Sequence, residues 1–199
     1  MIKAQAAAIV ALALALLAGG CASPPSRFHV LAATAVPDAG STVTSDAVMV
    51  DRVAIPAAVD RPQFVVHRGS NRVLIDEFNR WAEPLPEGIT RTLAENLAVL
   101  LGTPRVVSGP LAASFDPAYR VSVDIQRFES IRGQEVFLDA VWVVRGSSAG
   151  AAATSGRSAV REAVAGEGAD YEALAAAHSR ALAGLSRDIA AAIRAAGGR

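Results

Sequence analysis

The chain has 199 residues and a formal net charge of zero, and 52% of its residues are apolar. This length predicts one domain, large enough to fold around its own core without disulfides. The balanced charge argues against a nucleic-acid-binding protein, which usually carries a basic excess. Cys21 is the only cysteine and the three histidines are scattered, so the sequence predicts no intrachain disulfide, no metal site and no cofactor.

The first twenty residues have the pattern of a secretory signal peptide. Lys3 precedes an unbroken apolar run over residues 6–17, which is too short to span a hydrocarbon core of roughly 30 Å comfortably. The small residues 18–20 then lead to Cys21, an arrangement that resembles the bacterial lipobox. We therefore expect cleavage after Gly20 and a covalent lipid on Cys21; the alternative is an ordinary signal peptide with a chance cysteine.

A short tether follows the cysteine. Residues 22–27 separate Cys21 from the first apolar segment, and six extended residues reach at most ~20 Å. The domain should therefore lie close to its membrane. In lipoproteins of bacteria with two membranes, an aspartate directly after the cysteine tends to retain the protein on the inner membrane. Ala22 stands there instead, which favours the periplasmic face of the outer membrane.

The first half of the mature chain predicts strands. Apolar and β-branched residues predict strands over 28–32 and 47–55, the second ended by Pro56. The segments 63–67 and 72–78 flank a turn-forming cluster, Arg-Gly-Ser-Asn, and predict a β-hairpin.

A helix is predicted after the proline-containing segment 83–86. Apolar residues recur at helical spacing over 89–101, and Gly102 follows as the glycine typical of a helix C-terminus. A short strand over 105–108 should come next.

The second half predicts two long strands. Apolar and polar residues alternate over 119–126, and Phe128 falls out of step, so we expect a β-bulge near Gln126 or Arg127. The segment 135–144 is apolar at both alternating sets of positions, which is typical of a central strand covered on both faces.

The chain should end on a strand and a helix. A flexible connection over 146–156 leads to a strand over 158–164. Asp170 is a good N-cap for a closing helix over 171–196. The expected architecture is a single compact α/β domain, a mixed β-sheet of about five or more strands flanked by at least two helices. We divide the chain into a signal peptide (1–20), a lipidated cysteine with its tether (21–27) and a domain (28–199).

Several segments resemble one known family. They include Asp-Arg-Pro-Gln at 60–63, Arg-Trp-Ala-Glu-Pro-Leu at 80–85 and Leu-Asp-Ala-Val-Trp at 138–142, together with the closing segment 171–190. In these segments the chain resembles the PqiC/YmbA-type lipoproteins, auxiliary lipoproteins of ABC-type intermembrane transport systems. The resemblance covers essentially the whole mature chain.

The resemblance implies a set of partners. Members of this family accompany MCE-domain proteins, which form periplasmic passages for lipids or other apolar compounds, and an ABC-type transporter with its permease. The lipoprotein would be the outer-membrane docking piece that supports membrane integrity. Since MCE-type proteins assemble as rings, self-association of the lipoprotein is expected as well. No GxxxxGK[ST] motif for a nucleotide occurs in the sequence.

Three residues are candidates for partner binding, each with a structural alternative. Trp81 could anchor an interface or pack locally in the core beside Phe78. Arg61 and Arg80 could hold a phosphate or a partner carboxylate, or could pair with internal acids such as Asp60 or Glu83.

The other residues that could be reactive are better explained by structural roles. His178 lies on the apolar stripe of the last predicted helix, where a buried histidine is more common than a ligand. No G-x-S-x-G nucleophile motif is present, so we predict no catalytic residues and a protein that is not an enzyme. The alternatives are a lipid-anchored periplasmic hydrolase and a solitary lipoprotein that binds a small ligand.

Overall fold

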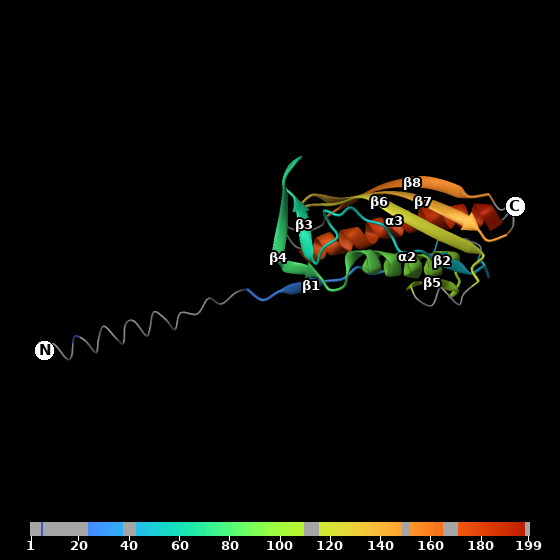
Figure 1. The fold of residues 1–199 in the computed structure, drawn as a ribbon, viewed down its shortest axis with the longest axis horizontal. Coiled ribbons are helices and arrows are strands. Elements are labelled where there is room, and N and C mark those ends of the chain that lie inside the picture. Colours follow the sequence, from blue (N-terminus) through green and yellow to red (C-terminus); the bar gives the residue numbers. More distant parts are fainter. Residues whose placement is uncertain are drawn as a thin grey trace.

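A computed structural model describes Gln5 and residues 24–37, 43–109, 116–148, 152–164 and 171–197. These ranges form one mixed sheet and two long helices (Figure 1). The strands are β1 (Arg27–His29), β2 (Val48–Val50), β3 (Gln63–His67), β4 (Val73–Trp81), β5 (Val106–Ser108), β6 (Tyr119–Ile131), β7 (Glu135–Gly146) and β8 (Thr154–Ala163). The helices are α2 (Leu85–Leu101) and α3 (Tyr171–Gly197). The predicted fold class is confirmed.

The sheet combines local hairpins with long-range parallel pairs. Its strand order is β1-β4-β3-β6-β2-β5, and β7 and β8 extend from β6 as an antiparallel meander. The predicted hairpin is β3 and β4. The predicted β-bulge is confirmed too, since the register of β6 on β7 shifts between Ile125 and Arg127. The expected strand over 47–55 is shorter than predicted, because the chain beyond Asp51 continues beside β6 only through single contacts such as the bridge from Ala54 to Asp124.

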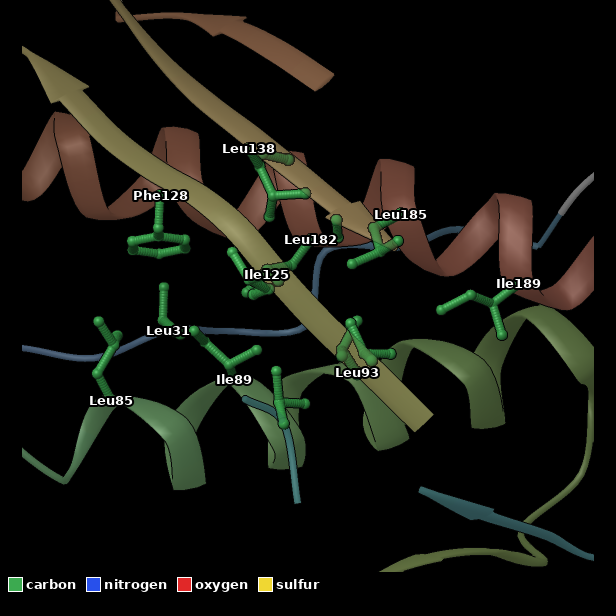
Figure 2. Packing of buried hydrophobic residues seen from close by; sticks show 14 of the residues in the cluster. Leu31, Leu85, Ile89, Leu93, Ile125, Phe128, Leu138, Leu182, Leu185 and Ile189 are labelled. Atoms are coloured by element: carbon green, nitrogen blue, oxygen red, sulfur yellow. The ribbon is translucent and has the colours of Figure 1, made fainter. Parts of the chain in front are cut away.

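Both helices pack on the inner face of the sheet. Helix α2 starts earlier than predicted, directly after Pro84, and ends at Gly102, whose φ of 66° is the left-handed conformation that glycine adopts readily. Helix α3 lies against β7, β8 and α2. Its proposed N-cap, Asp170, lies outside the described residues. Figure 2 shows the core side chains that meet between these layers, among them Leu85, Ile89, Leu93, Ile125, Phe128, Leu138, Leu182, Leu185 and Ile189.

The outer face of the β6–β8 meander is covered by its own charged side chains. Phe137 on β7 is buried between the guanidinium groups of Arg127 and Arg161, each 4.3 Å from its ring centroid. Asp139 accepts two hydrogen bonds from Arg157, at 2.8 and 2.6 Å, and these lower the pKa of its carboxyl group. The prediction that β7 is covered on both faces was therefore wrong in part. No helix packs on this face among the described residues, and Val141 on β7 stays 40% exposed.

Candidate functional site

The three predicted partner-binding residues come together where β4 ends. Arg80 on β4 lies opposite Phe28 of β1 on one side and Gln63 of β3 on the other. The backbone N–H of Trp81 donates to the carbonyl oxygen of Pro62 at 2.7 Å. This pairing brings the backbone around Arg61 against the end of β4, although the two segments are about twenty residues apart in the chain.

Trp81 points into the core. Its side chain is only 7% exposed and its ring stacks on that of Phe64, with centroids 4.3 Å apart. Phe78, the neighbour considered from the sequence, is 39% exposed instead. The burial of Trp81 fits the local-packing interpretation, and its contact with a partner stays a prediction. Since successive side chains of a strand point to opposite faces, Arg80 faces away from this core.

Arg61 and Arg80 lack the acidic partners that the sequence suggested. Glu83 accepts a hydrogen bond from Arg91 at 2.7 Å rather than from Arg80. Within the described ranges, Arg61 and Arg80 form no ion pair, and the Nε atom of each is shielded from solvent with no hydrogen-bond acceptor. Both side chains are half-buried. Among the described residues, the guanidinium groups of Arg61 and Arg80 therefore have no acid of the same chain to balance their charge.

Next to Trp81 lies an aromatic cluster around His178. This side chain of α3 is fully buried, and its ring stacks on Phe128 with centroids 3.8 Å apart. Its Nε2 atom hydrogen-bonds the Ser130 hydroxyl at 2.8 Å. Burial lowers the pKa of His178 to about 3, which keeps the imidazole neutral. This serine–histidine pair is sealed in the core, where no substrate reaches it in this conformation, and His178 is too weak a base to activate the serine near neutral pH.

A polar network, missed by sequence reasoning, ties β4 to β1 and α3. The Tyr171 hydroxyl at the start of α3 donates to Asp76 on β4 at 2.7 Å. Asp76 also accepts hydrogen bonds from Asn79 and from the backbone N–H of Phe78, and Asn79 in turn bonds His29. The sequence offered no signal for this network, because the pairing of residues 95 positions apart depends on the tertiary fold.

The network shifts the pKa values of Asp76 and Tyr171. Burial alone would raise the pKa of Asp76, but the hydrogen bonds from Tyr171, Asn79 and Phe78 outweigh it and hold that pKa below its usual value. Burial and the hydrogen bond to Asp76 raise the pKa of Tyr171 to about 12. Asp76 therefore serves as a charged anchor for the hairpin.

A groove of about 830 Å³ runs between β1 and α3 on the neighbouring surface. Its floor consists of small α3 side chains such as Ala176, and the exposed side chains of Phe28 and Val30 flank it. Arg27 and Arg187 also line the groove, whereas Arg180 in the same lining is held by Glu162 at 3.0 Å. The alanine-rich face of α3 was the one sequence feature that could have revealed it.

Cys21, the predicted lipidation site, lies outside the described residues. Of the residues that are described, none group into a histidine, cysteine and carboxylate cluster that could hold a metal ion. The helices of this part of the chain are all too short or too polar to cross a bilayer.

Comparison with known proteins identifies the family of the chain and finds solved structures with the same fold. The family of ABC-type transport auxiliary lipoprotein components matches residues 29–190. The chain belongs to this family. The resemblance to PqiC/YmbA-type lipoproteins is thereby confirmed, and the family connects the chain to ABC-type transport. None of the curated proteins is similar enough to match.

Two solved structures show the same fold as this auxiliary lipoprotein. A crystal structure of an uncharacterized protein is 18% identical, with a TM-score of 0.69; the similarity covers 85% of this chain and 99% of that one. A protein of family DUF330 from Xanthomonas campestris is 17% identical, with a TM-score of 0.68, over 87% of this chain and 97% of that one. At these identities the likeness concerns the fold alone.

Proposed function

We propose that this auxiliary lipoprotein is a non-enzymatic docking subunit of an intermembrane lipid-transport system. An acyl anchor on Cys21 would hold it at the periplasmic face of the outer membrane, where it supports membrane integrity. Its partner would be an MCE-domain protein served by an ABC-type transporter and permease. The family match over residues 29–190 supports the transport system, and the sequence around Cys21 supports the anchor.

The observation that carries the docking role is the pair of half-buried arginines without acidic partners. Arg61 and Arg80 offer guanidinium groups that carboxylates on a partner could bind in a bidentate manner. Trp81 would contribute from the core: its buried ring holds the end of β4, and its backbone N–H binds the carbonyl oxygen of Pro62, next to Arg61. Arginines without an acid of the same chain suit the binding of another protein. A hydrolase would instead need an accessible nucleophile.

Lipidation is tested with an alkyne-labelled fatty acid. The wild-type protein should take up the label, and Cys21→Ser should remain an unlabelled precursor that still carries its signal peptide. Equal labelling of the two proteins would overturn the anchor.

Docking is tested with the double variant Arg61→Gln/Arg80→Gln. Its binding to an MCE-type protein of the same organism should be at least about tenfold weaker, because charge-assisted hydrogen bonds are lost. The matched control is Arg52→Gln/Arg120→Gln, which removes two exposed arginines that already pair with acids of the same chain, Glu87 and Asp51. Equal binding by the two double variants would overturn the assignment of docking to Arg61 and Arg80.

Self-association of the lipoprotein belongs to the same proposal. A docking piece that meets a ring is most simply a symmetric oligomer itself. Sedimentation of the purified lipoprotein should therefore show an oligomer, and a monomer at micromolar concentration would remove this part of the proposal.

The groove between β1 and α3 favours a second candidate function, the binding of a small apolar ligand. Its volume and alanine floor suit an acyl chain, and Arg27 and Arg187 at its lining suit an acidic head group. Lipids extracted from the purified protein should be depleted by Ala176→Phe, which fills the groove. Ala191→Phe on an exposed position of α3 outside the groove is the control. Equal lipid content in both variants would dismiss the ligand.

A further inference from the structure

Strand β4 exposes a row of apolar side chains that the docking role does not use. Val73 is 44% exposed, Leu74 and Ile75 are each 37% exposed, and Phe78 is 39% exposed. We call these four residues the hairpin surface. Three of them are consecutive, so both faces of the strand are open to solvent there. Strand β1 pairs with β4 only from Asn79 to Trp81, so no strand of the described residues covers the outer edge of β4 along the hairpin surface.

The tip of the same hairpin is basic. Arg68 and Arg72 are exposed on either side of the turn, which is closed by a hydrogen bond from the Arg68 N–H to the Arg72 carbonyl oxygen at 2.8 Å. Of the two acidic side chains of β4, Asp76 is held by Tyr171, whereas Glu77 accepts a hydrogen bond from Gln63 at 3.1 Å and stays exposed beside the hairpin surface. The two arginines of the tip outnumber this one exposed carboxyl group. An apolar strand that ends in arginines has the chemistry of a surface that lies at an anionic lipid–water interface.

The position of the hairpin in the fold indicates that a membrane is what it contacts. Figure 1 shows β3 and β4 at the end of the domain where β1 begins. Arg27, the first residue of β1, is six residues from Cys21, so its distance from an acylated Cys21 is at most ~20 Å. The hairpin surface therefore lies on the part of the domain that the tether keeps nearest to the bilayer.

We propose that the hairpin surface, Val73, Leu74, Ile75 and Phe78, is a second membrane contact that seats the domain on anionic phospholipid. This inference rests on the proposed anchor at Cys21. The acyl chains on Cys21 hold the protein at the membrane but leave the domain free to turn on its tether, and an additional apolar and basic contact fixes the orientation of the domain. Arg61 and Arg80 would then have a constant position relative to the membrane.

The test places a tryptophan on the hairpin surface of the full-length protein. Phe78→Trp is reconstituted into vesicles of phosphatidylethanolamine and phosphatidylglycerol with brominated acyl chains, which quench tryptophan on contact. The matched control is Val141→Trp on the outer face of the meander, where the exposed fraction is nearly the same, 40% against 39%. The native Trp81 and Trp142 are common to both variants, and the signal of the wild-type protein is subtracted.

We expect quenching of the new tryptophan to be at least about threefold greater in Phe78→Trp than in Val141→Trp. Adding Arg68→Gln and Arg72→Gln should weaken the contact, by about fivefold for each arginine that meets anionic lipid. Equal quenching of the two tryptophan variants would overturn the proposal. The proposal would also be overturned if, in detergent without lipid, the new tryptophan became less accessible to solvent as the protein concentration rises. A second copy of the chain would then cover the hairpin.

Fatty-acid labelling of Cys21, measured on the same samples, keeps the two proposals apart. Labelled protein without quenching at position 78 would leave the anchor intact and reject the hairpin contact. Quenching at position 78 in unlabelled protein would support the hairpin contact and reject the anchor.

Discussion

The hairpin of β3 and β4 and the outer face of the β6–β8 meander are both sheet surfaces without a helix on them, yet they are built differently. On the meander, arginines and acids pair with one another, and Phe137 is enclosed by two guanidinium groups. On the hairpin, apolar side chains are exposed, and among the described residues Arg68 and Arg72 at the tip form no ion pair. The charged side chains of the meander thus pair with one another, whereas the apolar side chains and arginines of the hairpin end are open to a further contact. Function is therefore expected at the hairpin end, and substitutions should separate the two regions.

The largest expected effect tests the core that supports both regions. Leu97 of α2 is fully buried, so Leu97→Ala should lower the free energy of unfolding by about 2–5 kcal/mol. Val99, on the exposed side of the same helix, is the control, and Val99→Ala should cost less than about 0.5 kcal/mol. Thermal melts within a degree of each other would show that this face of α2 is not part of the core.

The next effect concerns close packing inside the meander. Gly156 on β8 lies directly opposite Trp142 on β7, and a Cβ atom at Gly156 would come within 2.2 Å of the indole ring. Gly156→Ala should therefore destabilise the protein by about 1–3 kcal/mol, measured by urea unfolding. The exposed neighbour Ser155→Ala should change little.

The crowding at Gly156 can be checked through its partner. In the double variant Trp142→Leu/Gly156→Ala, the two losses should be less than additive, because the indole that clashes is gone. Strict additivity would mean that Trp142 is not the reason for the glycine.

Part of this fold could be predicted from the sequence alone. Local patterns were enough for the β3–β4 hairpin, for the end of α2 at Gly102 and for the bulge after Ile125. Each of these depends on residues close together in the chain. The sequence could not predict that β1 pairs with β4, or that β2 lies between β5 and β6, because these parallel pairs join segments about fifty or more residues apart.

Two misreadings in the candidate site and the sheet have physical causes. Packing of Trp81 beside Phe78 was one of two alternatives, but residues three apart in a strand point to opposite faces, so Trp81 enters the core while Phe78 stays exposed. The apolar residues on both faces of β7 suggested a second covering layer. The stems and guanidinium groups of Arg127 and Arg161 cover Phe137 instead, which a count of apolar residues does not register.

A smaller effect concerns the attachment of the hairpin to the rest of the domain. Tyr171→Phe removes the hydrogen bond to the ionised Asp76 and should cost about 1.5 kcal/mol, a fall of several degrees in the melting temperature. Tyr119→Phe is the matched control, since the Tyr119 hydroxyl forms no hydrogen bond within the described ranges. Equal melting temperatures for the two variants would mean that Tyr171 does not hold the hairpin.

This attachment should also depend on pH. The pKa of Asp76 is lower in the folded protein than in the unfolded chain, where it is about 3.9, so the unfolded chain binds protons first as the pH falls. The stabilisation by Asp76 is therefore complete above about pH 5 and is lost below about pH 4, as the pH passes through the folded pKa. In Tyr171→Phe this loss between pH 5 and 3 should be shallower than in the wild type.

The smallest expected effect on stability is the most informative about the hairpin. Phe78→Ser removes an aromatic ring that is 39% exposed, so the free energy of unfolding should fall by only about 1 kcal/mol. Val141→Ser, at nearly equal exposure on the meander, should cost a similar amount. The two variants should differ in membrane contact, where Phe78→Ser weakens binding to anionic vesicles and Val141→Ser does not. A large loss of stability in Phe78→Ser would instead make the ring a structural element, and the difference between the two surfaces would then no longer point to function.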